Sequence, residues 1–213
     1  MLLGGYMGTF QEVEVLAVLI LGTANVAVET QGWGKSVVIG FGLLFWTARF
    51  IWGWRYLPHY LEERGFARPR EEGWAFFLLG CGLGVTALFL GGAFLGNLPL
   101  KTSFFWVVPL YVPWALAQQF FLCGVILRFL RKLFPVSLAV CLSALLFSLS
   151  HLPDIPLALL TLVAGTFWAS AFVRLKSIYP IALAHAVFGA LTYYLIFGQD
   201  LGQELLRLTG FIG

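Results

Sequence analysis

The chain has 213 residues, of which 60% are hydrophobic and only 11% are charged, and its mean hydropathy is +0.90. A water-soluble domain usually carries about 25% charged residues, so this composition excludes both a soluble globular protein and a disordered one. The net charge is only +3, and the basic residues form no single stripe, which argues against a nucleic-acid partner. The composition therefore indicates an integral membrane protein whose surroundings are the lipid bilayer.

Seven apolar segments follow one another along the chain, and each is near the ~20 residues that a helix needs to cross a bilayer. Basic residues at 49 and 55 interrupt the second segment, so a count of six to eight spans is compatible with the pattern. The sequence thus predicts an all-α, polytopic transmembrane helix bundle of about seven spans, at residues 13–28, 34–56, 74–96, 103–127, 136–152, 155–173 and 178–197.

One long polar connection divides the chain and suggests its organisation. We expect N-terminal spans over 1–57, a polar cytoplasmic loop over 58–73, a membrane core over 74–197 and a C-terminal interfacial tail over 198–213. Cytoplasmic loops of membrane proteins are enriched in Lys and Arg. A cytoplasmic N-terminus would place most of the 13 basic residues inside, namely Arg55, Arg64, Arg68, Arg70, Arg128, Arg131, Lys132, Arg174 and Lys176.

Polar side chains in the middle of apolar helices are costly and therefore mark candidate sites. Gln118 and Gln119 are adjacent in the fourth segment, and Cys123 lies four residues after Gln119, on the same helix face. His151 ends the fifth segment and His185 lies about two turns into the seventh. Imidazole can bind a metal or accept a proton near neutral pH, and amides can hold a water molecule or a carbonyl oxygen.

The order of these residues resembles the CPBP (or ABI) family, which comprises the type II CAAX prenyl endopeptidases and their bacterial relatives. Its members are polytopic helical membrane proteins with three ordered motifs, EExxxR, FxxxH and HxxxN. The corresponding segments here are QQFFLC at 118–123, FSLSH at 147–151 and HAVFG at 185–189. The resemblance covers roughly residues 60–197 and implies an intramembrane endopeptidase, expected in the cytoplasmic membrane of a bacterium with its N-terminus in the cytoplasm.

The departures from this pattern affect the chemistry that the resemblance implies. In the family, paired glutamates are held to activate the water that attacks the peptide, with two histidines and an asparagine assisting. Here Gln118 and Gln119 replace both glutamates, Cys123 replaces the arginine and Gly189 replaces the asparagine. An amide cannot accept a proton as a carboxylate does, so general-base catalysis by the first motif is lost. Only the two histidines carry over.

One interpretation is a peptidase with altered chemistry. His151 or His185 would act as the base, or both would hold a divalent metal such as zinc with Asp154 as a third ligand. Phe147, Asp154 and Gly189, which lie in or beside the motifs, would contact the substrate. That substrate would be a membrane-embedded or lipid-anchored peptide, or a C-terminal sorting segment.

Two further hypotheses remain open from the sequence. In one, Cys123 is a nucleophile whose proton a histidine withdraws, and Gln118 or Gln119 stabilises the oxyanion. In the other, the chain is a catalytically inactive relative that binds a membrane helix or a lipid chain in a polar cavity between the fourth, fifth and seventh spans. Replacement of the whole first motif favours the inactive relative, and retention of both histidines favours an enzyme.

Overall fold

A computed structural model describes residues 2–31, 34–57 and 59–203, and within these ranges the protein is all-helical, with no strand. The expected all-α bundle is confirmed. In chain order the helices are α1 (Leu2–Gln31), α2 (Lys35–Tyr56), α3 (Tyr60–Glu63), the 3-10 turn η1 (Glu71–Gly73), α4 (Trp74–Phe94), α5 (Phe104–Gln119), the π-helical η2 (Phe120–Leu127), α6 (Arg128–Leu133), α7 (Val136–Leu149), α8 (Ile155–Leu175), α9 (Tyr179–Leu191) and the π-helical η3 (Thr192–Ile196).

Each of the seven predicted apolar segments forms a helix. Among the described residues, five helical stretches are long and apolar enough to cross a membrane, and α7 is a shorter apolar helix. The remaining segment is α2, which carries Lys35, Arg49 and Arg55. The predicted tail at 198–213 is described only as far as residue 203, and 204–213 lie outside the described residues.

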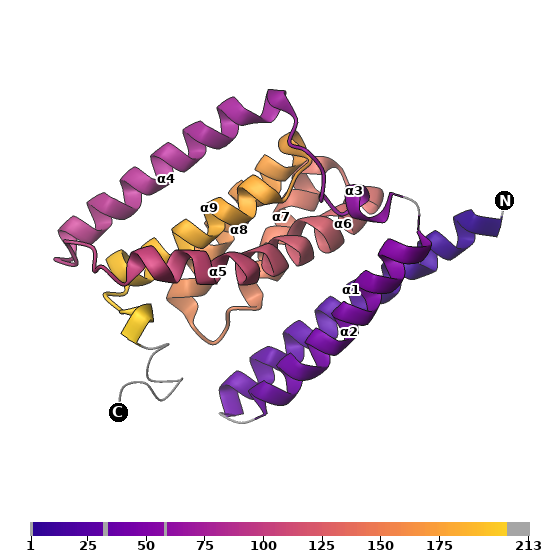
Figure 1. Ribbon diagram of the computed structural model, residues 1–213, viewed down its shortest axis with the longest axis horizontal. Coiled ribbons are helices and arrows are strands. Elements are labelled where there is room, and N and C mark those ends of the chain that lie inside the picture. The colour runs from indigo at the N-terminus through magenta and orange to yellow at the C-terminus, as the bar shows by residue number, and fades with distance from the viewer. Residues whose placement is uncertain (1, 32–33, 58, 204–213) are drawn as a thin grey trace.

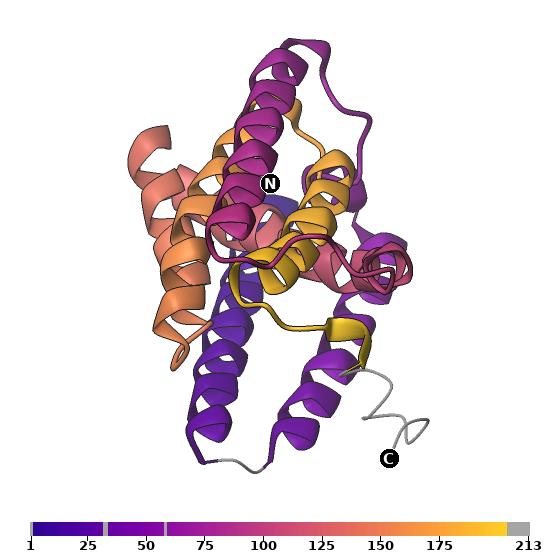
Figure 2. The same cartoon turned by 90° about the vertical axis from the view of Figure 1, so that its left-hand side faces the viewer.

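The helices form two groups, a core and an N-terminal hairpin (Figures 1 and 2). In the core, α7 packs along α8, α5 packs along α9, and α4 lies along the far side against η3. The hairpin of α1 and α2 reaches this core through η2, α3 and α6. Its other end, at the connection between α1 and α2, extends away from the core helices (Figure 1).

The helix that carries the first motif is unusual in its backbone. Pro109 and Pro113 lie inside α5, where each removes a backbone N–H donor. Directly after Gln119 the helix changes to π geometry and keeps it from Phe120 to Leu127 before continuing as α6. Residues of this π segment from Leu122 to Leu127 are all buried. Such π segments occur preferentially at functional sites.

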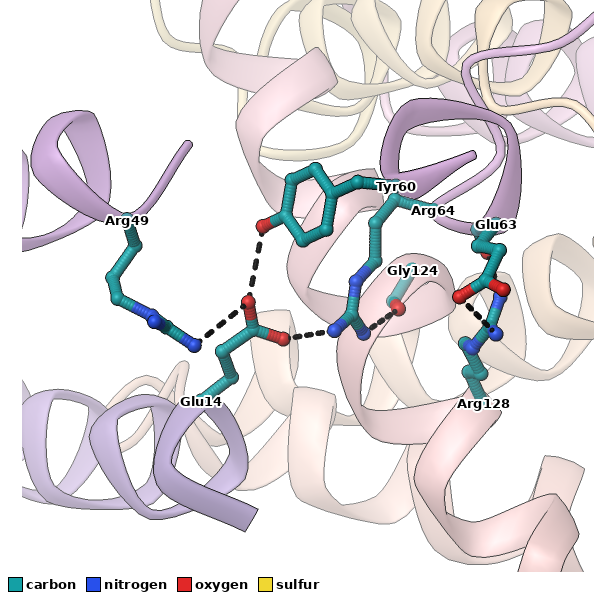
Figure 3. Close-up of polar contacts among 7 residues, drawn as sticks. All are labelled: Glu14, Arg49, Tyr60, Glu63, Arg64, Gly124 and Arg128. Carbon is teal, nitrogen blue, oxygen red and sulfur yellow. Dashed lines mark hydrogen bonds and ion pairs between the residues drawn. The ribbon is translucent and has the colours of Figure 1, made fainter. Parts of the chain in front are cut away.

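A buried ionic cluster fastens the hairpin to this helix (Figure 3). The Glu14 carboxylate of α1 is fully buried, and it accepts hydrogen bonds from Tyr60 Oη at 3.0 Å, from Arg49 Nη2 at 3.5 Å and from Arg64 Nη2. Arg64 Nη1 also donates to the carbonyl oxygen of Gly124 at 2.8 Å. We call Glu14, Arg49, Tyr60 and Arg64 the Glu14 cluster. It joins α1, α2 and the polar loop to the first-motif helix.

A second polar cluster secures the opposite end of the core. Tyr194 Oη donates to Ser103 Oγ at 2.8 Å, and Ser103 Oγ donates to Asp200 Oδ1 at 2.8 Å. The backbone N–H of Gly202 also donates to Asp200 Oδ1 at 3.0 Å, and Lys101 Nζ lies 3.6 Å from Asp200 Oδ2. These contacts join the segment after α9 to the start of α5, the two helices that position the site.

The Glu14 cluster gives a stability prediction. We expect Glu14→Ala to destabilise the protein by about 3–5 kcal/mol, because it leaves the buried guanidinium of Arg64 and the partly buried one of Arg49 without this carboxylate. Glu12→Ala is the matched control, since Glu12 lies on the same helix but is exposed, and surface changes usually stay within about 0.5 kcal/mol. Thermal unfolding of both variants in detergent measures the difference. Equal melting temperatures would contradict the role assigned to the cluster.

Candidate functional site

A large cavity of about 2170 Å³ lies between the hairpin and the core. Most of its lining is apolar and comes from α1, α2, α4, α5, η2, α7, α8 and α9. Polar groups reach this cavity from the core side, including Tyr111, Gln118, His151 and His185. Predicted site residues from all three motifs therefore share one cavity, namely Gln118, Phe147, His151, Asp154, His185 and Gly189.

Gln119 lies behind this wall and holds His185 by a hydrogen bond. Gln119 Nε2 donates to His185 Nδ1 at 2.8 Å, and Cys123 Sγ donates to Gln119 Oε1 at 3.5 Å. Gln119 and Cys123 are fully buried, and His185 is only 7% exposed. Because the amide N–H is the donor, His185 Nδ1 must be the acceptor, and the ring proton of the neutral imidazole is on Nε2.

The Nδ1 atom of His151 donates a hydrogen bond, whereas that of His185 accepts one. His151 Nδ1 lies 2.8 Å from the carbonyl oxygen of Phe147, one helical turn earlier. A carbonyl oxygen can only accept a hydrogen bond, so Nδ1 carries the proton and Nε2 keeps its lone pair. The two histidines therefore differ in tautomer: His185 presents an N–H donor and His151 presents a basic nitrogen.

Aromatic packing fixes both imidazole rings. The Phe147 ring lies edge-on to His151 at 4.8 Å and edge-on to His185 at 6.0 Å between centroids. Trp168 stacks on His185 at 6.0 Å with an interplanar angle of 18°. Phe147 itself rests on Gly165, where an added Cβ would lie 3.1 Å from its ring. Phe147, the Phe of the FxxxH pattern, thus packs against both histidine rings.

Gln118 has surroundings quite different from those of its neighbour. Its side chain lines the cavity, and its Oε1 is buried without a hydrogen-bond partner among the described residues. A buried polar atom without a partner costs free energy unless a ligand supplies the missing hydrogen bond. Of the two adjacent amides, Gln119 is part of the protein's own network and Gln118 is available to a ligand.

Cys123 and Asp154 are placed differently from the two histidines. The residues found to line the cavity do not include Cys123, whose thiol is buried behind Gln119. Asp154 lines the cavity, and its Oδ1 accepts the backbone N–H of Leu157 at 3.0 Å as the N-cap of α8. In the described ranges, no three His, Cys, Asp or Glu side chains are grouped as a metal would require. The zinc hypothesis stays a prediction without a third ligand.

Tyr111 is the site residue that the sequence patterns did not mark. It lies on α5 between Pro109 and Pro113, lines the cavity and places its ring edge-on to His185 at 6.2 Å between centroids. Gly189, the last position of the third motif, also lines the cavity beside it. An aromatic residue in an apolar helix gives no signal of its own, although a tyrosine between two prolines could have drawn attention.

Comparison with known protein families supports the resemblance drawn from the motifs. Residues 99–191, which contain all three motifs, match the family model of the type II CAAX prenyl endopeptidase Rce1-like proteins. This part of the membrane core is therefore similar to the Rce1-like proteins. The matched segment begins before α5 and ends with α9, so α1, α2 and the Glu14 cluster lie outside it. No curated protein and no solved structure matches the chain.

The different roles of the two glutamines give a prediction with an internal control. We expect Gln119→Leu to destabilise the helical core by about 1–3 kcal/mol, because His185 Nδ1 would remain buried without a donor. Gln118→Leu should be neutral or stabilising, because Gln118 makes no hydrogen bond to the described residues. Thermal unfolding in detergent compares the two variants. A larger loss for Gln118→Leu would show that the roles are reversed.

Proposed function

We propose that this protein is an intramembrane endopeptidase in which His151 is the general base and His185 is a hydrogen-bond donor to the substrate. The observation that carries the proposal is the pair of opposite tautomers on one cavity wall, each fixed by a hydrogen bond at Nδ1. Hydrolysis of a peptide needs both a base for water and a donor for the developing oxyanion. The site offers both without the glutamates of the family pattern.

The chemistry follows from the atoms that face the cavity. His151 Nε2 takes a proton from a water molecule as the water oxygen attacks the scissile carbonyl carbon. His185 Nε2–H donates to the carbonyl oxygen, which becomes negatively charged in the tetrahedral intermediate. The C–N bond then breaks, and His151 returns the proton to the departing amine. The products are a new C-terminal carboxyl group and a new amino group.

The buried relay behind His185 supports its role as donor. The thiol of Cys123 donates to Gln119, and Gln119 donates to His185, so each group orients the next. We infer that Cys123 belongs to this relay and is not the nucleophile, since its sulfur contacts the amide and is fully buried. A serine at position 123 would preserve the donor.

The cavity also indicates the kind of substrate. Its apolar lining fits a membrane-embedded or lipid-anchored peptide, including a C-terminal sorting segment. The free Gln118 amide supplies a polar contact along the substrate backbone. Hydrolysis would take place in the cytoplasmic membrane of a bacterium. We propose that the N-terminus of the protein is cytoplasmic, because most basic residues then lie on the cytoplasmic side.

One observation favours the alternative of a binding protein without activity. The groups that replace the first motif are neutral, and Gln119 is wholly used in a structural network. A large cavity with a mostly apolar lining suits binding of a membrane helix or a lipid chain.

Mapping the C-termini of membrane proteins by mass spectrometry separates the two functions. Otherwise identical strains would carry the native chain, His151→Ala, His185→Ala, Cys123→Ser or His59→Ala. We expect new C-termini with the native chain, their loss in the first two variants, and their retention in the last two. His59 is the matched control because it is exposed and contacts Glu62 in the polar loop.

Immunoblotting of the membrane fraction would establish that every variant is inserted at the native level. Identical C-termini in all strains would leave the binding protein as the better account. New termini that disappear with Cys123→Ser alone would support thiol chemistry instead.

A further inference from the structure

The hydroxyl group of Tyr111 has no hydrogen-bond partner among the described residues. Tyr111 lies on α5, and its side chain is partly buried. The same side chain lines the cavity. A hydroxyl group facing an apolar cavity costs free energy that a phenylalanine would avoid. The cost is recovered if the hydroxyl meets a polar group of a ligand.

Gly189 determines where the Tyr111 ring lies. A Cβ built on Gly189 would come within 2.6 Å of Tyr111 Cε1 and 3.4 Å of its hydroxyl oxygen. The ring therefore occupies the volume that any side chain at position 189 would need. Residue 189 is one helical turn after His185, so the hydroxyl is placed on the same face of α9 as the imidazole.

The rings of Tyr111 and His185 are themselves in edge contact, at 6.2 Å and 83°. His185 Nδ1 is already engaged by Gln119, which leaves its Nε2–H as the donor to the cavity. Two donors therefore lie on neighbouring side chains that line the cavity, an imidazole N–H from α9 and a phenolic O–H from α5.

We propose that Tyr111 is the second hydrogen-bond donor to the carbonyl oxygen of the substrate, acting beside His185. This inference rests on the proposed peptidase function and deepens it by assigning a residue to the oxyanion. A developing oxyanion is stabilised best by donors already fixed in place, and removal of one such donor costs about 10²–10³-fold in kcat. The Tyr111 ring packs closely against the backbone at Gly189 and against the edge of the His185 ring, and these contacts hold it in place.

The first test uses the cleavage site found by C-terminal mapping. A synthetic peptide that spans this site would be the probe, with the native chain, Tyr111→Phe and Tyr179→Phe each reconstituted in proteoliposomes. We expect Tyr111→Phe to lower kcat and kcat/KM equally, by about 10²–10³-fold. Tyr179→Phe is the control, because Tyr179 is exposed, and should cleave at the native rate.

The outcomes separate this inference from the proposed function. Native rates for Tyr111→Phe would overturn the role of Tyr111 and leave the peptidase standing. A raised KM with unchanged kcat would also overturn it, since the hydroxyl would then serve ground-state binding. If the native chain produces no new C-terminus, both the proposed peptidase function and the role of Tyr111 are contradicted.

A second test examines the geometry without relying on activity. Gly189→Asn should lower the melting temperature, because its Cβ cannot fit beside the Tyr111 ring. Combining it with Tyr111→Ala should restore most of the loss by freeing that volume. Gly82→Asn is a control, since Gly82 has open space where its Cβ would be. If Gly189→Asn melts at the native temperature, the ring does not occupy this space and the proposal fails.

Discussion

The hydrogen bond from Gln119 to His185 is the interaction on which the site depends. It uses a buried amide where the family pattern has a carboxylate, and an amide can donate where a carboxylate can only accept. The donor fixes the imidazole proton on Nε2. His151, bound through its own Nδ1 to a carbonyl oxygen, is left with the complementary tautomer. In the proposed mechanism, His185 is therefore the donor and His151 the base.

The Glu14 cluster shows how this chain uses its few charges. A carboxylate, two guanidinium groups and a phenol compensate one another inside the structure, and one guanidinium also binds the backbone of the π segment at Gly124. The hairpin that forms the far wall of the cavity is attached at this point (Figure 3). The hairpin and its attachment lie outside the residues that match the Rce1-like family model, which begin at residue 99.

Hydropathy alone was sufficient to predict a helix at each of the seven apolar segments, because a spanning helix requires a long apolar run. The bounds were less accurate, since α1 begins at Leu2 and the first-motif helix continues to Leu133. The motif pattern also singled out Gln118, His151 and His185, which the fold places on one cavity. The sequence could not show which of the adjacent glutamines has which role, because that depends on which face of α5 meets His185. It could not mark Tyr111 either, since the close approach of its ring to Gly189 depends on how α5 packs against α9. Glu14, in an apolar first segment, finds its partners 35 to 50 residues away.

The opposite tautomers of His151 and His185 are the central claim, and ¹⁵N solid-state NMR of histidine-labelled protein in bilayers measures them directly. The chain has only three histidines, so single variants assign every signal. At neutral pH we predict that His151 carries its proton on Nδ1 and His185 on Nε2, and that Gln119→Leu perturbs the His185 signals alone. Finding both histidines in the same tautomer would contradict the account.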